Sequence, residues 1–285
     1  MELPLIGRRD AVLDGITGFV ENYDFSLANS SYEARVHAVT KVASICYQSP
    51  KALDSVSLFN RLQAESAGLP SSSYEFVPVL LPLYKLIDID QDNGTTNVEK
   101  FGELLEVTDE FGDAYLLTNL RALIEDVGPE ESLNYLNTSE EEIQIIRDNF
   151  KVFLFNVDVP TRTQMIRHRV SWQELSRRYV SGKKQPFDFY ISKKMANINS
   201  EADIDYSTIS TTYDELITAC TNFYETAITS GVKPEEARRI LPQAMMTTIW
   251  GAFQPKQLES YFKLRLDKHA QKEIRQVSEA MKELL

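Results

Sequence analysis

The sequence has few cysteines and few histidines, which excludes two kinds of site. Cys46 and Cys220 are the 2 cysteines among 285 residues, and neither lies in a paired motif. A disulfide framework and a cysteine-based metal site are therefore not expected, and both thiols are predicted to be small buried side chains. The 3 histidines are too scattered for metal-ligand spacing. We expect no bound metal.

Long apolar runs and glycine-rich motifs are also missing. No stretch approaches the roughly 18 apolar residues of a membrane helix, and Arg8 and Arg9 lie where a signal peptide needs an apolar segment. A soluble, cytoplasmic protein with no membrane partner is expected. Neither GxGxxG nor the P-loop motif occurs, so a dinucleotide would need a non-Rossmann site. The nucleophile elbow of the α/β-hydrolases is absent as well.

Charge is distributed unevenly along the chain. The net charge is −12, with 30 Lys and Arg against 42 Asp and Glu, which argues against a nucleic-acid partner. Most of this excess lies between Lys85 and Phe150, where 17 acids accompany 4 bases. Between Pro160 and Lys184 there are 7 bases, and Glu174 is the one acid. This basic segment is compatible with a local anion site.

Apolar spacing predicts several helices, because apolar residues recur every three to four positions. Ser139 is expected to cap the helix that follows it, with acids in the first turn, and Gly231 to end the helix before it. The predicted helices are residues 32–47, 55–67, 116–125, 139–149, 213–230 and 257–285.

Two strands are predicted as well. Residues 151–159 combine β-branched and aromatic side chains and end at Pro160. Residues 75–81 form the second strand, and Pro78 favours the edge or the end of a sheet. With 43% hydrophobic residues the chain can bury a substantial core. We expect a single α/β domain over residues 1–285 with an acidic insertion at about 83–150, which is a solvated excursion or an oligomer contact rather than a second catalytic site.

The segment from Gln164 to Tyr179 carries the residue types of a nucleotide site. Its Arg167-His168-Arg169 triplet follows a predicted strand and a proline, at a transition where ligands are often held. Next come an acceptor for a sugar hydroxyl, a hydroxyl donor and two guanidinium forks suited to phosphate. These residues are Glu174, Ser176, Arg177 and Arg178. An exposed basic helix face explains the same residues equally well, and both interpretations stay open on this segment alone.

Further arginines lie in the C-terminal third. Arg238 and Arg239 precede Pro242, and Arg265 begins a set of polar residues at helical spacing that continues to Gln276. A solvated helix face explains this set, whereas convergence of separate arginines on one ligand is the alternative.

Two separated blocks resemble the flavin-dependent thymidylate synthases. The first runs from Gln164 to Tyr179 and follows the family signature of Arg-His-Arg and Glu-x-Ser-x-Arg-Tyr, with six residues rather than seven between Arg169 and Ser176. The second follows the family in order and spacing over residues 230–232, 237–242 and 264–274. The resemblance covers about two thirds of the chain and leaves residues 83–150 as the insertion.

The resemblance implies a fold, a cofactor and a reaction. The fold is α/β (α+β), with a central mixed or antiparallel sheet flanked by helices. The family forms homotetramers with shared active sites that hold FAD. The methylene of methylenetetrahydrofolate passes to C5 of dUMP, and flavin reduced by NADPH supplies the hydride, giving dTMP and tetrahydrofolate.

Site residues carried over by position fall into two groups. The resemblance makes Arg265 the residue that polarises the uracil ring, since a fixed cation in a dry site stabilises charge developing on the pyrimidine oxygens. Arg265 and Ser176 are the catalytic candidates. The candidates for substrate binding are Gln164, Arg167, Glu174, Ser176, Arg177, Arg178, Arg238 and Arg265. Those for the flavin and folate side are Ser72, Glu75, Arg167, His168, Arg169, Gln254 and Ser260.

The departures from the family pattern fall mostly on the flavin side. Pro70 and Phe76 stand where the family has a histidine pair, and Gln254 and Ser260 replace two asparagines. The shortened signature motivates one alternative, a pyrimidine nucleotide hydroxymethylase that uses the same folate. Pro70, Phe76 and Ser260 motivate another, a nucleotide-binding relative without flavin.

Overall fold

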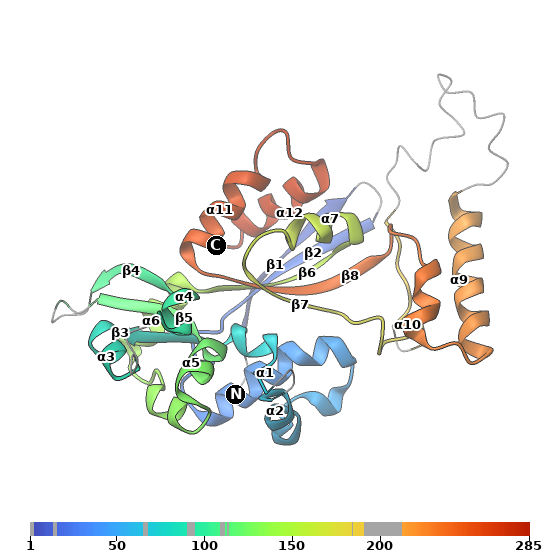
Figure 1. Ribbon diagram of the computed structural model, residues 1–285. Coiled ribbons are helices and arrows are strands. Elements are labelled where there is room, and N and C mark those ends of the chain that lie inside the picture. Colours follow the sequence, from blue (N-terminus) through green and yellow to red (C-terminus); the bar gives the residue numbers. More distant parts are fainter. Residues whose placement is uncertain are drawn as a thin grey trace.

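The chain forms two antiparallel sheets and the helices that cover them (Figure 1). The computed structural model describes residues 3–13, 16–64, 68–89, 95–108, 112, 114–183, 185–190 and 213–285. Within these ranges no helix is both long enough and apolar enough to span a membrane.

The larger sheet has five strands in the order β1-β2-β6-β8-β7, and each neighbouring pair is antiparallel. Its strands are β1 (Leu5–Leu13), β2 (Ile16–Tyr23), β6 (Lys151–Asp158), β7 (Ser171–Glu174) and β8 (Met246–Phe253). The predicted strand 151–159 is confirmed as β6. β1, β2 and β8 were not predicted. β1 and β2 pair with each other in the first third of the chain, whose sequence pattern favours helices, whereas β8 pairs with β6 and β7, which are distant in sequence.

Side chains of the larger sheet alternate between two hydrophobic cores, as the pleat of a strand requires. Val152 of β6 lies in one core, and Phe153 and Phe155 lie in the other. β7 and β8 approach closely, because a Cβ atom on Gly251 would lie 2.5 Å from the ring of Trp172 on the facing strand. Glycine is required at this position for the indole ring to pack.

The smaller sheet has three strands in the order β3-β5-β4. They are β3 (Pro78–Pro82), β4 (Glu103–Thr108) and β5 (Ala114–Asn119). β3 is an edge strand, as its proline predicted. The Asn137 side chain pairs with this edge: Leu80 N donates to Asn137 Oδ1 at 3.0 Å, and Asn137 Nδ2 donates to Leu80 O at 2.8 Å. The amide thus satisfies backbone groups that a further strand would otherwise pair.

Helices of the first half begin at polar caps. Ser31, Ser55 and Ser139 each accept a backbone amide at the start of α1, α2 and α6. The elements are α1 (Tyr32–Tyr47), α2 (Val56–Leu62), α3 (Leu86–Ile89), α4 (Asn97–Lys100), α5 (Leu120–Val127) and α6 (Glu140–Asn149), with 3-10 turns η1 (Pro50–Ala52), η2 (Ser72–Phe76), η3 (Leu83–Lys85) and η4 (Glu131–Tyr135). The predictions for α1 and α6 are confirmed, and α2 is shorter than expected.

The second half contains α7 (Val159–Met165), α9 (Tyr213–Thr229), α10 (Pro234–Ala237), the 3-10 turn η5 (Arg238–Ile240), α11 (Pro255–Arg265) and α12 (Lys272–Lys282). Gly231 has φ of +90° just after α9, in agreement with its predicted role. The single helix predicted over 257–285 is wrong. Asp267 Oδ1 accepts the amide of His269 at 2.8 Å, and this local side-chain bond competes with the helix between α11 and α12.

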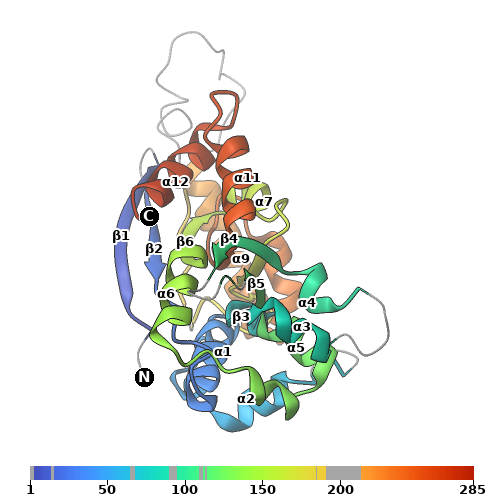
Figure 2. The ribbon, with the colours of Figure 1, turned by 90° about the vertical axis from the view of Figure 1, so that its left-hand side faces the viewer.

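The two cores lie on opposite faces of the larger sheet (Figure 2). α11 and α12 cover one face, whereas α1 and α2 lie against the other, next to the smaller sheet. The α/β fold class with antiparallel sheets flanked by helices is confirmed.

The acidic segment is packed into the protein, which contradicts a solvated excursion, whereas the alternative of an oligomer contact stays a prediction. Leu117, Leu120 and Leu123 are buried in the same core as Val79 of β3. The helix predicted over 116–125 is half wrong, because its first residues belong to β5. β5 forms because it pairs with β3, and the local sequence pattern does not predict this pairing. Cys46 and Cys220 are half-buried rather than buried.

Candidate active site

Arg265, the last residue of α11, joins two of the sequence blocks. Its Nε donates to His168 Nε2 at 2.8 Å, and its terminal amino group donates to the carbonyl of Gln164 at 2.7 Å. The His168 ring packs on Tyr261, with 4.7 Å between ring centroids. Tyr261 lies one helical turn before Arg265 and is fully buried. The guanidinium is therefore fixed at two atoms and supported by an aromatic floor.

His168 is held in its neutral form by this contact. Burial lowers the pKa of His168, and the charge of Arg265 lowers it further. A neutral Nε2 accepts the Arg265 N–H, whereas a protonated ring would place two cations in contact. Arginine remains charged at neutral pH even though burial also lowers the pKa of Arg265.

Gln164 is fixed by both its backbone and its side chain. Besides its carbonyl contact with Arg265, its Nε2 donates to Gln271 Oε1 at 2.6 Å, in the turn between α11 and α12. Arg167 is exposed beside this group. The turn that breaks the predicted C-terminal helix thus contributes a contact to the site.

Glu174 ends β7 and lies between two partners. Its carboxylate pairs with Arg162 Nε at 3.1 Å and accepts Thr247 Oγ1 at 2.9 Å. Ser176 follows after one residue, and its carbonyl accepts the amides of Tyr179 and Val180. This turn carries the chain from β7 into the arginine pair.

The arginine pair divides between the interior and the surface. Arg177 is only 7% exposed, donates to the carbonyl of Gln185 at 3.1 Å and stacks its guanidinium 4.8 Å from the Phe187 ring centre. This placement is at odds with its predicted role in holding phosphate. Arg178 is exposed instead.

Arg178 meets Arg238 at Glu235, the second residue of α10. The Glu235 carboxylate lies 4.0 Å from Arg178 Nε, and its carbonyl accepts Arg238 Nε at 3.3 Å. Both arginines are exposed. Two guanidinium groups from residues 60 positions apart therefore lie next to the same residue. A pair of exposed guanidinium groups is suited to the recognition of an anion.

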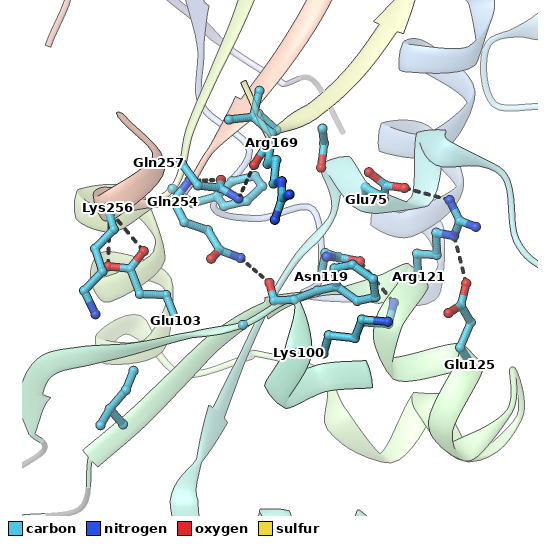
Figure 3. Close-up of a pocket in the computed structure, with 18 residues that line it drawn as sticks. Glu75, Lys100, Glu103, Asn119, Arg121, Glu125, Arg169, Gln254, Lys256 and Gln257 are labelled. Atoms are coloured by element: carbon cyan, nitrogen blue, oxygen red, sulfur yellow. Dashed lines mark hydrogen bonds and ion pairs between the residues drawn. The ribbon is translucent and has the colours of Figure 1, made fainter. Parts of the chain in front are cut away.

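A pocket of about 790 Å³ lies between the smaller sheet and the start of α11. Figure 3 shows Arg169 and Gln254 reaching it from one side and Asn119 and Lys100 from the other, with Glu75 near Arg121. Its lining residues are Glu75, Lys100, Phe101, Gly102, Glu103, Leu104, Asn119, Arg121, Ala122, Glu125, Phe150, Arg169, Val170, Ser171, Ala252, Gln254, Lys256 and Gln257.

Three of the candidate flavin residues line this pocket, namely Glu75, Arg169 and Gln254. The others lie elsewhere: Arg167 and His168 stand at the Arg265 group, and Ser260 is exposed on α11. Ser72 Oγ donates to Gln173 Oε1 at 2.5 Å, and Gln173 Nε2 donates to Cys46 Sγ at 2.9 Å.

Several residues of these groups were missed from the sequence. Tyr261 on α11 and Gln271 in the turn before α12 support Arg265 and Gln164, but neither an aromatic nor an amide residue at such a position gives a distinct sequence signal. Lys100, Asn119 and Arg121 line the pocket because β5 pairs with β3 and α5 follows it. Only the pairing of the strands, which the sequence pattern did not predict, would have indicated them.

Known proteins match the half of the chain that holds the Arg265 group. The profile of a family described as "Thymidylate synthase complementing protein" matches residues 141–285. The flavin-dependent thymidylate synthase of Aquifex aeolicus is 33% identical over 146 residues, which cover 48% of this chain and 45% of the relative. That of Pyrococcus furiosus is 30% identical over 137 residues, covering 46% and 53%. The protein of the same name from Geobacter sulfurreducens is 27% identical over 137 residues, covering 47% and 56%.

The chain belongs to the thymidylate synthase complementing protein family. It spans about half the length of the curated relatives that it matches. The resemblance inferred from the two sequence blocks is thereby confirmed, since Gln164, His168 and Arg265 all lie in the matched half. Glu75 and the pocket wall from Lys100 to Glu125 lie outside the match.

Proposed function

We propose that this protein transfers the one-carbon unit of methylenetetrahydrofolate to C5 of dUMP, with FAD as cofactor and NADPH as reductant, and forms dTMP. The observation that carries the proposal is the Arg265 group. Its contacts of 2.8 Å to His168 and 2.7 Å to Gln164 fix a cation from the second sequence block against the first. A preorganised guanidinium of this kind stabilises negative charge that develops on a reacting ring.

The nucleotide would be held by residues on both sides of β7. Arg178 and Arg238, which meet at Glu235, supply two exposed guanidinium groups for the 5′-phosphate. Ser176, half-buried in the turn that follows β7, would add a hydroxyl. Glu174 would accept a ribose hydroxyl, although its present partners Arg162 and Thr247 leave it only part of its acceptor capacity.

The pocket has the donor set that a flavin dinucleotide requires. Arg169 is a cation for the diphosphate, and Gln254 and Asn119 are amides for the polar edges of rings. Phe101 and Phe150 supply apolar surface for planar groups. A volume of about 790 Å³ lies within the usual range for cofactor sites. When bound, reduced FAD would supply the hydride that completes the methyl group.

The reaction balances without a nucleophile from the chain. A bond would form between the folate methylene and C5 of dUMP, and both bonds from the methylene to folate nitrogens would break. A hydride from reduced FAD would complete the methyl group, while the C5 proton and the second flavin hydrogen, as a proton, would go to the two nitrogens. The role of this chain is to polarise the pyrimidine. The Arg265 guanidinium would face a pyrimidine carbonyl, and neutral His168 would keep the guanidinium oriented by accepting a hydrogen bond from its Nε.

The assembly is proposed to be a homotetramer with shared active sites, as in the family it resembles. Native mass spectrometry of the full chain tests this directly. Four copies are expected, and a monomer at micromolar concentration would contradict the proposal.

A flavin spectrum tests the chemistry. The purified chain is incubated with FAD and desalted, and NADPH is added without oxygen. We expect a flavin absorption band that bleaches with NADPH and returns only when both dUMP and methylenetetrahydrofolate are added. Return of the band with neither substrate, or with folate alone, would contradict the proposed transfer to dUMP.

A further inference from the structure

One wall of the pocket comes from residues 97–125, outside the family match. This wall consists of α4, β4, β5 and the first turns of α5. It contributes nine of the 18 lining residues, among them Lys100, Asn119 and Arg121 (Figure 3). The acidic segment, which the sequence pattern placed away from the chemistry, therefore shapes the pocket proposed for flavin.

Arg121 is the residue through which this wall meets the rest of the pocket. Its terminal nitrogen donates to Glu75 Oε1 at 2.7 Å, and its Nε donates to Glu125 Oε1 at 2.8 Å. All three side chains are at most 30% exposed. Burial alone lowers the pKa of Arg121, but hydrogen bonds to Glu125 and Glu75 outweigh this and raise it.

The wall is also bonded to the matched half of the chain. Gln254 Nε2 donates to the carbonyl of Phe101 at 2.9 Å, and the amide of Lys256 donates to the Glu103 carboxylate at 3.0 Å. Gly102 between them admits no side chain, because a Cβ atom would lie 2.4 Å from the carbonyl of Val98. The wall is thus fixed on both sides of the pocket.

The charges of the lining leave a problem for an anionic ligand. Glu75, Glu103 and Glu125 all line the pocket. Glu103 is bonded to a neutral backbone amide, while Glu75 and Glu125 share Arg121 as a cation. Without Arg121, these two carboxylates would face any diphosphate at low effective dielectric, where like charges repel strongly. In the described part of the chain, Arg169 forms no ion pair with a carboxylate, so its charge remains available to the ligand.

We propose that Arg121 is a positioning residue of the flavin pocket. It holds the Glu75 carboxylate against the wall and offsets the charge of Glu75 and Glu125, so that the diphosphate of a flavin dinucleotide binds beside them and against Arg169. This inference rests on the proposed function in taking FAD as the ligand. It adds that a segment outside the matched half of the chain determines the affinity for that ligand.

FAD titration of the full chain, followed by flavin fluorescence, tests the inference at low and high ionic strength. Arg121→Gln is expected to weaken FAD binding by about tenfold or more at low salt. Because the loss arises from repulsion, it is expected to shrink at high salt. Glu125→Gln added to Arg121→Gln removes one of the exposed charges and is expected to recover part of the affinity.

The matched control is Arg147→Gln. Arg147 lies on α6 and pairs with Asp24 at 2.9 Å, and it does not line the pocket. It is expected to bind FAD like the wild type. If Arg121→Gln does not fold, as judged by thermal unfolding, Arg121→Lys keeps the charge without the fork and is expected to bind FAD more weakly than the wild type and to unfold at a similar temperature.

The outcomes separate this inference from the proposed function. The inference is overturned if folded Arg121→Gln, or Arg121→Lys in its place, binds FAD with an affinity within twofold of the wild type. It is also overturned if the loss of FAD affinity changes neither at high salt nor when Glu125→Gln is added. Weakened FAD binding in a protein that makes no dTMP supports the inference and contradicts the reaction. A wild-type chain that binds no FAD contradicts both.

Discussion

At the scale of single residues, the proposed activity depends on Arg265, whose guanidinium is held by two hydrogen bonds. Its fork donates to His168 and to the Gln164 carbonyl from adjacent nitrogens. A lysine has the charge but only one nitrogen, so it cannot make both contacts in this geometry. Replacing Arg265 with lysine therefore keeps the positive charge but removes the fixed orientation, so it separates the two effects.

Arg265→Lys is expected to lower kcat by about 100-fold or more, the size of effect seen when one preorganised donor is lost. The KM for dUMP is expected to change much less. Steady-state kinetics measures both constants. Arg275→Lys is the control, because Arg275 lies on α12, where its guanidinium contacts the Lys268 carbonyl and lies 3.9 Å from Glu279. A kcat for Arg265→Lys close to that of the control would refute the role of Arg265.

His168 predicts an acid limb in the pH profile. Its pKa in the folded protein is lowered from 6.5 by burial and by Arg265. His168 is therefore mostly neutral above pH 6.5. As the pH falls from there through the lowered pKa, the ring becomes protonated and activity is expected to decrease. His168→Gln keeps an oxygen acceptor for Arg265 and does not titrate. Its kcat is expected to lack this limb between pH 5 and 7, and an unchanged limb in the variant would assign it to another group.

At the scale of elements, the edge of β3 is closed by one side chain. Asn137 makes paired hydrogen bonds to the backbone of Leu80, and it also accepts Asn29 Nδ2 at 2.7 Å. All of these atoms are buried, so loss of the amide leaves unpaired polar groups without water.

Asn137→Ala is therefore expected to lower the free energy of unfolding by about 2–4 kcal/mol. Urea unfolding followed by circular dichroism measures it. Asn134→Ala removes an exposed amide three positions earlier, which donates to Glu131, and is expected to change stability little. Equal effects of the two variants would show that the edge pairing contributes nothing.

The contact of β7 with β8 gives a second expectation for an element. Gly251→Ala would push a methyl group into the Trp172 ring and is expected to cost about 1–3 kcal/mol. Trp172→Leu in the same chain is expected to relieve part of this cost. Thermal unfolding of the two single variants and the double variant measures the coupling, and additive effects would exclude the clash.

Local signals predicted the elements that carry their own start and stop residues. α1 and α6 begin at Ser31 and Ser139, and β6 is a β-branched run ending before a proline. Strands defined by distant partners, such as β5 and β8, were missed because pairing energy comes from residues far away in sequence. The break after Arg265 was missed because it depends on one Asx-type bond at Asp267.

The candidate site divides in the same way. The resemblance indicated Gln164, His168 and Arg265, and the structure brings these together. Arg177 was expected beside them, but an aromatic neighbour at Phe187 takes its guanidinium into the interior. The sequence around two adjacent arginines does not tell which one turns inward.

At the scale of the whole molecule, the chain combines a matched half with a half that supplies a pocket wall. The five-stranded sheet holds the Arg265 group, whereas the smaller sheet and α5 enclose the pocket with Arg169 and Gln254. The two halves share one core, since Trp250 of β8 lies in the cluster that contains Leu117 and Leu123 of the acidic segment. Both halves therefore contribute residues to the pocket and to one core.

The identity of the nucleotide product tests the central claim most directly. Full-length protein is incubated with dUMP, methylenetetrahydrofolate, FAD and NADPH, and the nucleotide is analysed by mass spectrometry. We expect dTMP, formed only when all four are present and absent with Arg265→Ala. A hydroxymethylated nucleotide, or dUMP recovered unchanged from protein that holds flavin, would contradict it.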